Sequence, residues 1–96
     1  MAWVYLLLCG DNSLYVGATT DLVGRLADHQ AGKGGAFTSR RRPVVLVHSE
    51  AFANIQEAVA RERQIKRWTR QKKEALIGGD VETLHTREAH ATRVVN

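Results

Sequence analysis

Two tyrosines and two basic side chains near the start of the chain could carry out chemistry together. Tyr5 and Tyr15 each stand in a short apolar run, and Arg25 and His29 follow them four residues apart, so the latter two share one face of a helix. A phenol accepts a proton when a nearby cation or metal favours the phenolate. An arginine stabilises the negative charge that develops on a phosphate. These residue types suit the hydrolysis of a phosphodiester.

Glu62 is the one carboxylate placed to join this group, because it lies at the boundary of the core-facing side of a long predicted helix. The chain has no carboxylate cluster of the two-metal type, no paired cysteines and no His-x-x-x-His motif. Structural alternatives exist for each residue. Strand tyrosines are usually half-buried packing residues, and Glu62 with Lys66 is an ordinary i,i+4 helix pair.

The elements that must position these side chains begin with two apolar runs, 3–9 and 14–18. Four turn-forming residues separate the runs, which predicts an antiparallel hairpin. Alternation along the first strand puts Tyr5 on one face, and on the second strand Tyr15 shares a face with Gly17. A glycine at this strand end predicts a bulge or a close approach of the backbone.

A short helix is predicted over 21–30, with the two preceding threonines as candidate N-caps and Asp21 in the first turn. Residues 31–42 combine glycines, hydroxyl side chains and arginines, which predicts a loop suited to phosphate. Pro43 then opens an apolar strand, 44–48. Its near-continuous hydrophobicity indicates a central strand of the sheet.

The second half of the chain is predicted to be helical. A long helix begins after Asn54, which forms a capping-box-like start with Glu57, and a further helical piece covers 70–77. Thr69 is a candidate cap between them, so one kinked helix and two helices both agree with the sequence. The pair of glycines at 78–79 predicts the helix end.

The length of 96 residues corresponds to one domain, and the apolar fraction of 44% is ordinary for a globular protein. No apolar run approaches the length of a membrane helix. Cys9 is the only cysteine and lies in an apolar run, which predicts an inert core thiol and a reducing compartment, the cytoplasm. We expect residues 1–79 to form the domain and 80–96 to be a C-terminal tail, either a short helix or partly disordered.

Basic residues are concentrated in the middle of the chain. Residues 25–73 contain 12 of the 14 lysines and arginines and four acids, a net charge of +8 in a chain of net charge +4. Such a region is typical of proteins that bind a polyanion, with a solvated helix face as the alternative. The candidates for contacts with nucleic-acid phosphates are Lys33, Arg40, Arg41, Arg42, Arg63, Lys66, Arg67 and Arg70.

The order and spacing of these motifs resemble the GIY-YIG nuclease domain, and within it the small single-domain bacterial branch of that superfamily. The resemblance covers about residues 3–77 and implies an α/β (α+β) fold. This fold has a small three-stranded antiparallel sheet flanked by helices, in the order β-β-α-β-α-α. The motifs that carry it are Trp3-Val4-Tyr5 in place of Gly-Ile-Tyr, Tyr15-Val16-Gly17, Arg25 to His29, Gly32-Lys33-Gly34, and Arg61-Glu62 with Ile65-Lys66.

The resemblance also implies metal-dependent phosphodiester hydrolysis with named roles. Tyr15 would be the general base or would orient the attacking water, and Tyr5 would support the site by hydrogen bonding. Arg25 would stabilise negative charge on the phosphate. His29 corresponds to a position that activates or orients the water. Glu62 would hold one divalent ion, Mg²⁺ or Mn²⁺, whose remaining ligands would be waters and substrate phosphate.

We therefore expect an endonuclease-type enzyme that acts on structured, damaged or single-stranded DNA, as in DNA repair, with RNA as an alternative substrate. A non-catalytic nucleic-acid-binding module on the same fold is the second interpretation, and a protein-interaction domain is the third. Ala18 stands where several family members carry a lysine, for which Lys33, His29 or Lys66 could substitute. Salt-sensitive binding without cleavage would favour the binding module.

Overall fold

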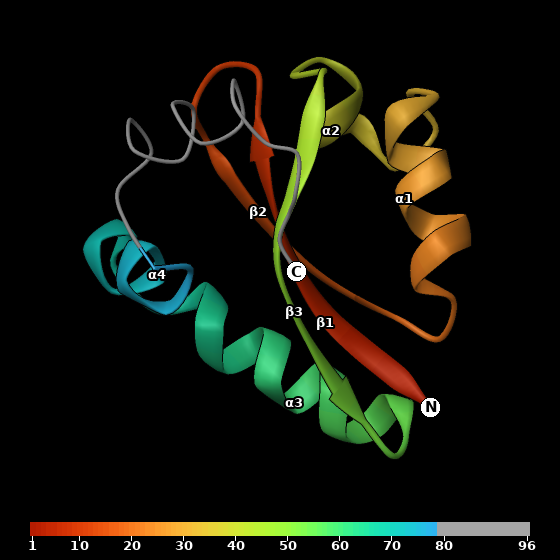
Figure 1. The fold of residues 1–96 in the computed structure, drawn as a ribbon, viewed down its shortest axis with the longest axis vertical. Helices are drawn as coiled ribbons and strands as arrows, with labels where there is room; N and C mark the ends of the chain where they lie inside the picture. The colour runs from red at the N-terminus through yellow and green to blue at the C-terminus, as the bar shows by residue number, and fades with distance from the viewer. Residues whose placement is uncertain (79–96) are drawn as a thin grey trace.

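Three antiparallel strands form a sheet that divides the molecule into two sides (Figure 1). The computed structural model describes residues 1–78. The strands are β1 (Ala2–Cys9), β2 (Leu14–Thr19) and β3 (Val44–Phe52), in the spatial order β2-β1-β3. The predicted hairpin is confirmed, because β1 and β2 pair directly across the turn.

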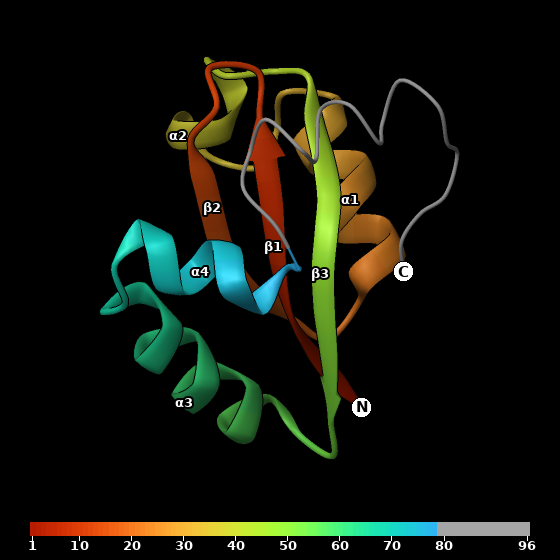
Figure 2. The ribbon, with the colours of Figure 1, turned by 60° about the vertical axis from the view of Figure 1, so that its left-hand side comes forward.

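Helices cover both sides of the sheet. The helices α1 (Leu22–Gln30) and α2 (Ala36–Ser39) lie on one side, called here the α1 side. The helices α3 (Ile55–Lys66) and α4 (Arg70–Leu76) lie on the other, the α3 side (Figure 2). The predicted α+β fold with a small three-stranded sheet is confirmed, and α2 is an additional short helix.

Two predictions about the middle of the chain are wrong. Strand β3 is an edge strand and not a central one, and it continues beyond residue 48 to Phe52. Its apolar half is covered on both faces, since Val44 packs with Tyr5 on the α1 side while Val47 packs against the apolar cluster on the α3 side. The predicted loop 31–42 contains the single turn α2, which is too short to produce a helical repeat in the sequence.

Side-chain caps fix the starts of the longer helices. The Asp21 carboxylate accepts a hydrogen bond from the backbone N–H of Gly24, so Asp21 itself is the N-cap of α1 and the prediction of a threonine cap is wrong. Thr19 instead accepts from the backbone N–H of Asp21. Asn54 caps α3 as predicted, and Thr69 caps α4, so the second half contains two helices.

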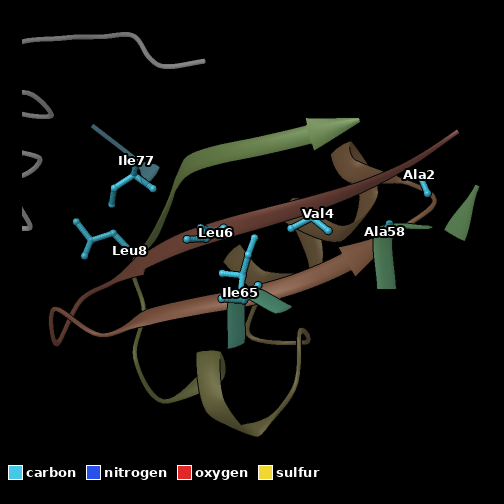
Figure 3. Close-up of a cluster of buried hydrophobic side chains, with 8 residues drawn as sticks. Ala2, Val4, Leu6, Leu8, Ala58, Ile65 and Ile77 are labelled. Atoms are coloured by element: carbon cyan, nitrogen blue, oxygen red, sulfur yellow. The ribbon is translucent and has the colours of Figure 1, made fainter. Parts of the chain in front are cut away.

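The α3 side of the sheet holds the aliphatic core (Figure 3). Alternation along β1 sends its even-numbered side chains to this side, where α3 and α4 cover them. Complete burial of one such leucine contributes roughly 1.5–3 kcal/mol relative to exposure. The aliphatic core comprises Ala2, Val4, Leu6, Leu8, Val16, Ala58, Ile65 and Ile77.

No helix among residues 1–78 is long and apolar enough to cross a membrane.

The α1 side of the sheet buries a smaller cluster made by Tyr5, Leu7, Cys9 and Val44. Cys9 is a free and buried thiol, and burial raises its pKa, as expected for an inert core residue. This cluster also contains the phenol of Tyr5. The α1 side therefore combines packing with polar groups that need hydrogen-bond partners.

Candidate active site

The β1–β2 hairpin brings the two predicted tyrosines to the α1 side of the sheet. Tyr5 on β1 lies directly opposite Gly17 on β2. A Cβ atom at Gly17 would lie 2.5 Å from the Tyr5 hydroxyl. The absence of a side chain at Gly17 therefore leaves the space over β2 that the Tyr5 ring fills. The close approach predicted at Gly17 is confirmed. The rings of Tyr5 and Tyr15 have centroids 6.3 Å apart.

A buried hydrogen-bond chain links Tyr5 to α1 and α2. The Tyr5 hydroxyl and His29 Nε2 are 2.9 Å apart, and His29 Nδ1 and Thr38 Oγ1 are 2.8 Å apart. All three residues are at most 1% exposed. A Cβ atom at Gly34 would collide with the His29 ring, so this glycine makes room for the imidazole. Both ring nitrogens of His29 are thus engaged inside the protein.

Burial raises the pKa of Tyr5 to about 12, partly offset by the Arg25 guanidinium, while charge repulsion from Tyr15 and Glu62 adds to the rise. Burial, and then the charge of Arg25, lower the pKa of His29 below its ordinary value. At neutral pH, therefore, Tyr5 is a protonated phenol and His29 is a neutral imidazole. At neutral pH the Tyr5 hydroxyl therefore keeps its proton, and the His29 ring keeps one N–H.

Tyr15 occupies a different environment from Tyr5. Its side chain is half-buried, with its ring against the edge of His29 at a centroid distance of 5.2 Å and against Phe37 at 5.8 Å. The Phe37 ring is 40% exposed, and the Arg41 guanidinium stacks on it at 3.9 Å. Tyr15 is the phenol of this pair that a substrate can reach.

Arg25 lies between the two phenols. Hydrogen bonding to Tyr5 raises the pKa of Arg25, burial opposes this, and Tyr15 contributes in the same direction as Tyr5. One Arg25 Nη donates to the carbonyl oxygen of Gly34 at 3.1 Å, and the other lies 3.8 Å from Asp28. A fixed cation next to two phenols can stabilise negative charge on a phenolate or on a phosphate.

Glu62 approaches the same centre from the other side of the sheet. Helix α3 packs over β2, which is an edge strand, so a residue of α3 can reach around that edge. Burial makes the largest contribution to the raised pKa of Tyr5 and charge repulsion from Glu62 the smallest, so Glu62 and Tyr5 interact electrostatically. Its side chain is 17% exposed and one oxygen lies 2.8 Å from Lys66 Nζ, the i,i+4 pair expected from the sequence.

A divalent ion would find one protein ligand in this part of the molecule. No group of three or more His, Cys, Asp or Glu side chains that could hold a metal occurs among residues 1–78. A lone carboxylate oxygen fits Mg²⁺ or Mn²⁺, since such ions keep several waters and share their coordination with substrate phosphates. Glu62 therefore fits an ion that binds together with the substrate and displaces Lys66, and does not fit a preformed metal cage.

The predicted phosphate-binding residues divide into two groups. Arg41 is bonded to Asp11 at 2.9 Å, Arg42 donates to two backbone carbonyls, and Arg70 pairs with Glu74 at 3.0 Å. Lys66 pairs with Glu62. Within residues 1–78, four of these predicted side chains form no hydrogen bond or ion pair with the protein: Lys33, Arg40, Arg63 and Arg67.

Two of these free arginines line a shallow hollow of about 420 Å³ on α3. Arg63 and Arg67 form its basic part, and Trp68 forms an aromatic wall. The Trp68 ring already has Arg61 at 5.0 Å and Lys72 at 4.5 Å from its centroid. The hollow is thus a cationic surface on the exposed face of α3, on a different side of the helix from Glu62.

Sequence reasoning did not identify Thr38, Gly34 or Phe37 as site residues. They lie in the segment that was predicted to be a phosphate-binding loop, and the spacing from His29 to Thr38 matches no helical or strand repeat. The position of Ala18, where a lysine was noted as missing, faces the aliphatic core and not Tyr15. The missing lysine therefore leaves the α1 side unchanged.

Comparison with known proteins gives consistent matches over most of the chain. The family model of the GIY-YIG catalytic domain matches residues 1–75. A UPF0213 protein of Staphylococcus haemolyticus is 51% identical over 75 residues, which cover 78% of this chain and 92% of the relative. A UPF0213 protein of Halobacterium salinarum is 46% identical over 77 residues, which cover 80% of this chain and all of the relative.

Two solution NMR structures share the fold. The UPF0213 protein of Bacillus halodurans is 37% identical, with a TM-score of 0.55, over 95% of this chain and 100% of that chain. A protein of E. faecalis is 33% identical, with a TM-score of 0.52, over 98% of this chain and 93% of that chain. These similarities extend over the strands and helices that carry the site.

Proposed function

The chain belongs to the GIY-YIG catalytic domain family, and we propose that it is a divalent-metal-dependent endonuclease that hydrolyses phosphodiester bonds in DNA. The observation that supports this most directly is that Tyr5, Tyr15 and Arg25 lie together, while α3, which carries Glu62, packs over the neighbouring strand β2. This set supplies a proton acceptor, a cation and a metal ligand at one place.

In the proposed reaction, Tyr15 accepts a proton from the attacking water, whose oxygen forms the new bond to phosphorus. The bond from phosphorus to the leaving oxygen breaks, and that oxygen takes up a proton from solvent. Arg25 donates hydrogen bonds to the phosphate oxygens as their charge grows. Tyr5 and His29 hold Arg25 in place from the buried side. Glu62 would hold a divalent ion, which supplies further neutralisation of that charge.

The proposed DNA path follows the free cations. Arg63 lies on the exposed face of α3 and Arg67 directly follows that helix, while Lys33 and Arg40 lie in the segments beside α2. Such contacts fix the strand without reading its sequence. Structured, damaged or single-stranded DNA, as met in DNA repair, is the proposed substrate, with RNA as an alternative.

The proposed nuclease domain spans residues 1–79 and acts in the cytoplasm. The predicted tail 80–96 lies outside the described residues.

One observation favours a second function, a nucleic-acid-binding module without turnover. Lys66 Nζ lies 2.8 Å from a carboxylate oxygen of Glu62. A metal ion must therefore displace Lys66 before Glu62 can bind it. Binding by the free arginines would persist in such a module and would weaken steeply with salt.

A cleavage assay separates the two functions. Purified protein is incubated with labelled single-stranded, duplex and branched DNA in Mg²⁺, in Mn²⁺ or in chelator, beside Glu62→Gln and the matched variant Glu57→Gln. Glu57 lies in the first turn of the same helix and accepts from the backbone N–H of Ala53. We expect cleavage by wild type and Glu57→Gln only. Salt-sensitive binding without cleavage in either metal would establish the binding module.

A further inference from the structure

Phe37 on α2 is an exposed aromatic ring next to the phenol that a substrate can reach. The ring is 40% exposed, although phenylalanine is among the residues most often buried. Its centroid lies 5.8 Å from that of Tyr15, with 32° between the two ring planes. Two neighbouring rings therefore lead from Tyr15 to the surface of the α1 side. An exposed ring at this place can pack against a flat, apolar part of a substrate.

The guanidinium of Arg41 lies on the Phe37 ring and is held there by other groups. Its Cζ is 3.9 Å from the ring centroid. Arg41 Nε donates to Asp11 Oδ2 at 2.9 Å, and Nη1 donates to the backbone carbonyl of Phe37 at 2.8 Å. Asp11 is held in turn, because its other oxygen accepts from the Ser13 hydroxyl at 2.6 Å and from the Ser13 backbone N–H at 3.0 Å. A ligand that binds here therefore has less side-chain freedom left to remove.

The charges around Phe37 and Arg41 favour a base over a phosphate as the ligand. Arg41 and Asp11 form an ion pair whose net charge is zero. A phosphate is better served by Lys33 and Arg40, whose charges are not compensated within the described residues. A nucleic-acid base is flat and uncharged, and it stacks both on aromatic rings and on guanidinium planes. The exposed surfaces of the Phe37 ring and of Arg41, whose side chain is 33% exposed, match such a base.

We propose that Phe37 and Arg41, called here the Phe37–Arg41 stack, bind the unpaired base of a nucleotide beside the bond that is cut. The placement beside the cut bond rests on the proposed function. In a duplex both faces of a base are covered by its neighbours, so a side chain can stack on a base only after the base leaves the duplex. The stack therefore narrows the proposed substrate to nucleic acid that is single-stranded or locally unpaired.

Binding in the presence of a chelator, where metal-dependent cleavage is absent, tests the inference. The probes are oligo(dT), a strand of the same length in which tetrahydrofuran replaces every nucleoside, and a duplex. The two single strands carry the same number of phosphates, so the ratio of their affinities measures contacts with the bases. Phe37→Leu removes the ring and keeps an apolar side chain and the backbone carbonyl that Arg41 contacts. Arg41→Lys keeps the charge and removes the plane. The control is Arg40→Ala, which removes the uncompensated charge next to Arg41.

We expect wild type to bind oligo(dT) about 10-fold more tightly than the strand without bases, within the range for one stacked base. This preference should be largely lost in Phe37→Leu and reduced in Arg41→Lys, while the affinity of both variants for the duplex stays at the wild-type level. Arg40→Ala should weaken binding to both single strands by the same factor, because it removes a phosphate contact. During cleavage, a single tetrahydrofuran moved along the strand should slow the wild-type reaction most next to the cut bond, and this maximum should disappear in Phe37→Leu.

The other outcomes overturn the proposal. Equal affinity of wild type for the two single strands shows that no base is bound, and a Phe37→Leu protein that keeps the preference shows that the base binds elsewhere. A Phe37→Leu protein that loses the same factor for all three probes shows a structural or phosphate contact. The proposed function fails separately: a wild-type protein that cleaves nothing in Mg²⁺ or Mn²⁺ refutes the nuclease, while the affinity ratio still decides whether the stack binds a base. If Arg41→Lys does not fold, Phe37→Leu decides alone.

Discussion

The two sides of the sheet use the same central strand for different purposes. On the α3 side, Leu6 and Leu8 of β1 join an entirely apolar core. On the α1 side, Tyr5 of the same strand joins His29 and Thr38 in a buried hydrogen-bond chain. The two buried polar residues of the described chain, His29 and Thr38, both lie on the α1 side.

This difference indicates where the molecule gains stability and where it positions chemistry. A buried polar group costs free energy unless it is hydrogen-bonded, and the α1 side satisfies its groups through specific partners. Tyr5 and Tyr15 show the same division at closer range. Tyr5 is a buried phenol held by His29, and Tyr15 is a half-buried phenol open to a substrate.

Substitution of two adjacent leucines of β1 tests the difference between the two sides of the sheet most strongly. Leu6 and Leu7 are both fully buried on opposite sides, and Leu7 lies directly opposite Tyr15 on β2. We expect Leu6→Ala and Leu7→Ala each to lower the free energy of unfolding by about 3 kcal/mol in urea titrations. Only Leu7→Ala should lower the cleavage rate per folded molecule, because its cavity loosens Tyr15. Equal rates in the two variants would break the division between sides.

Gly34→Ala tests the fit of His29 without touching any polar group. A Cβ there collides with the imidazole, so the ring must move away from Tyr5 and Thr38. We expect cleavage to fall roughly 10–100-fold, within the range for a misplaced catalytic constellation. In a His29→Ala background the same change should add little, which a double-mutant cycle measures. Additive losses would show that Gly34 acts elsewhere.

Glu50 tests whether the ionic network on the α3 side is structural. Its carboxylate accepts from Arg61 at 2.9 Å and lies 2.8 Å from His48 Nε2. The hydrogen bond from Arg61 lowers the pKa of Glu50. The stabilisation is therefore present above the unfolded-state pKa, and it is lost as pH falls through the lower folded-state value.

We expect Glu50→Gln to lower the free energy of unfolding by about 2 kcal/mol at pH 7. The difference from wild type should shrink as the pH is lowered below about 4.5, the ordinary pKa of the group. Cleavage per folded molecule should stay at the wild-type level. Glu74→Gln is the control, since its i,i+4 pair with Arg70 is worth about 0.3–0.5 kcal/mol. A constant difference down to pH 3 would contradict the assignment.

The smallest expected effect concerns the free arginines of α3. Arg63→Ala and Arg67→Ala should each reduce the salt dependence of DNA binding by about one phosphate contact, a slope change of about 0.7–0.9. Arg42→Ala is the comparison, because Arg42 donates to the Ser39 and Gln30 carbonyls. Binding titrations between 50 and 200 mM salt, roughly the usual range, measure these slopes. An unchanged slope for both α3 variants would remove this surface from the proposed DNA path.

Local signals predicted much of this fold. The turn between β1 and β2, the Asn54 and Thr69 caps and the Glu62–Lys66 pair all depend on residues close in sequence. The order of the strands could not be predicted in this way, since β3 pairs with β1 across about forty residues and an edge strand covered on both faces looks central in sequence. The helix α2 is a single turn and leaves no repeat.

The candidate site was predictable only in part. The tyrosines, Arg25 and His29 were found from motif spacing, and the structure brings them together. Thr38 was not found, because its contact with His29 depends on the path of a glycine-rich segment that no local pattern specifies. Arg41 was predicted to bind phosphate, and its pairing with Asp11 joins residues thirty positions apart.

The central claim, that Tyr15 acts on the substrate while Tyr5 holds the site together, is tested most directly by two matched variants. Single-turnover cleavage and urea unfolding are measured for Tyr15→Phe and Tyr5→Phe. We expect Tyr15→Phe to lose about 10³-fold in rate, within the range for general acid–base groups, with wild-type stability. Tyr5→Phe should lose about 1–3 kcal/mol of stability, since it leaves His29 Nε2 unsatisfied, and should keep measurable cleavage. A Tyr15→Phe protein that cleaves at the wild-type rate, or a larger loss of rate in Tyr5→Phe, would contradict the claim.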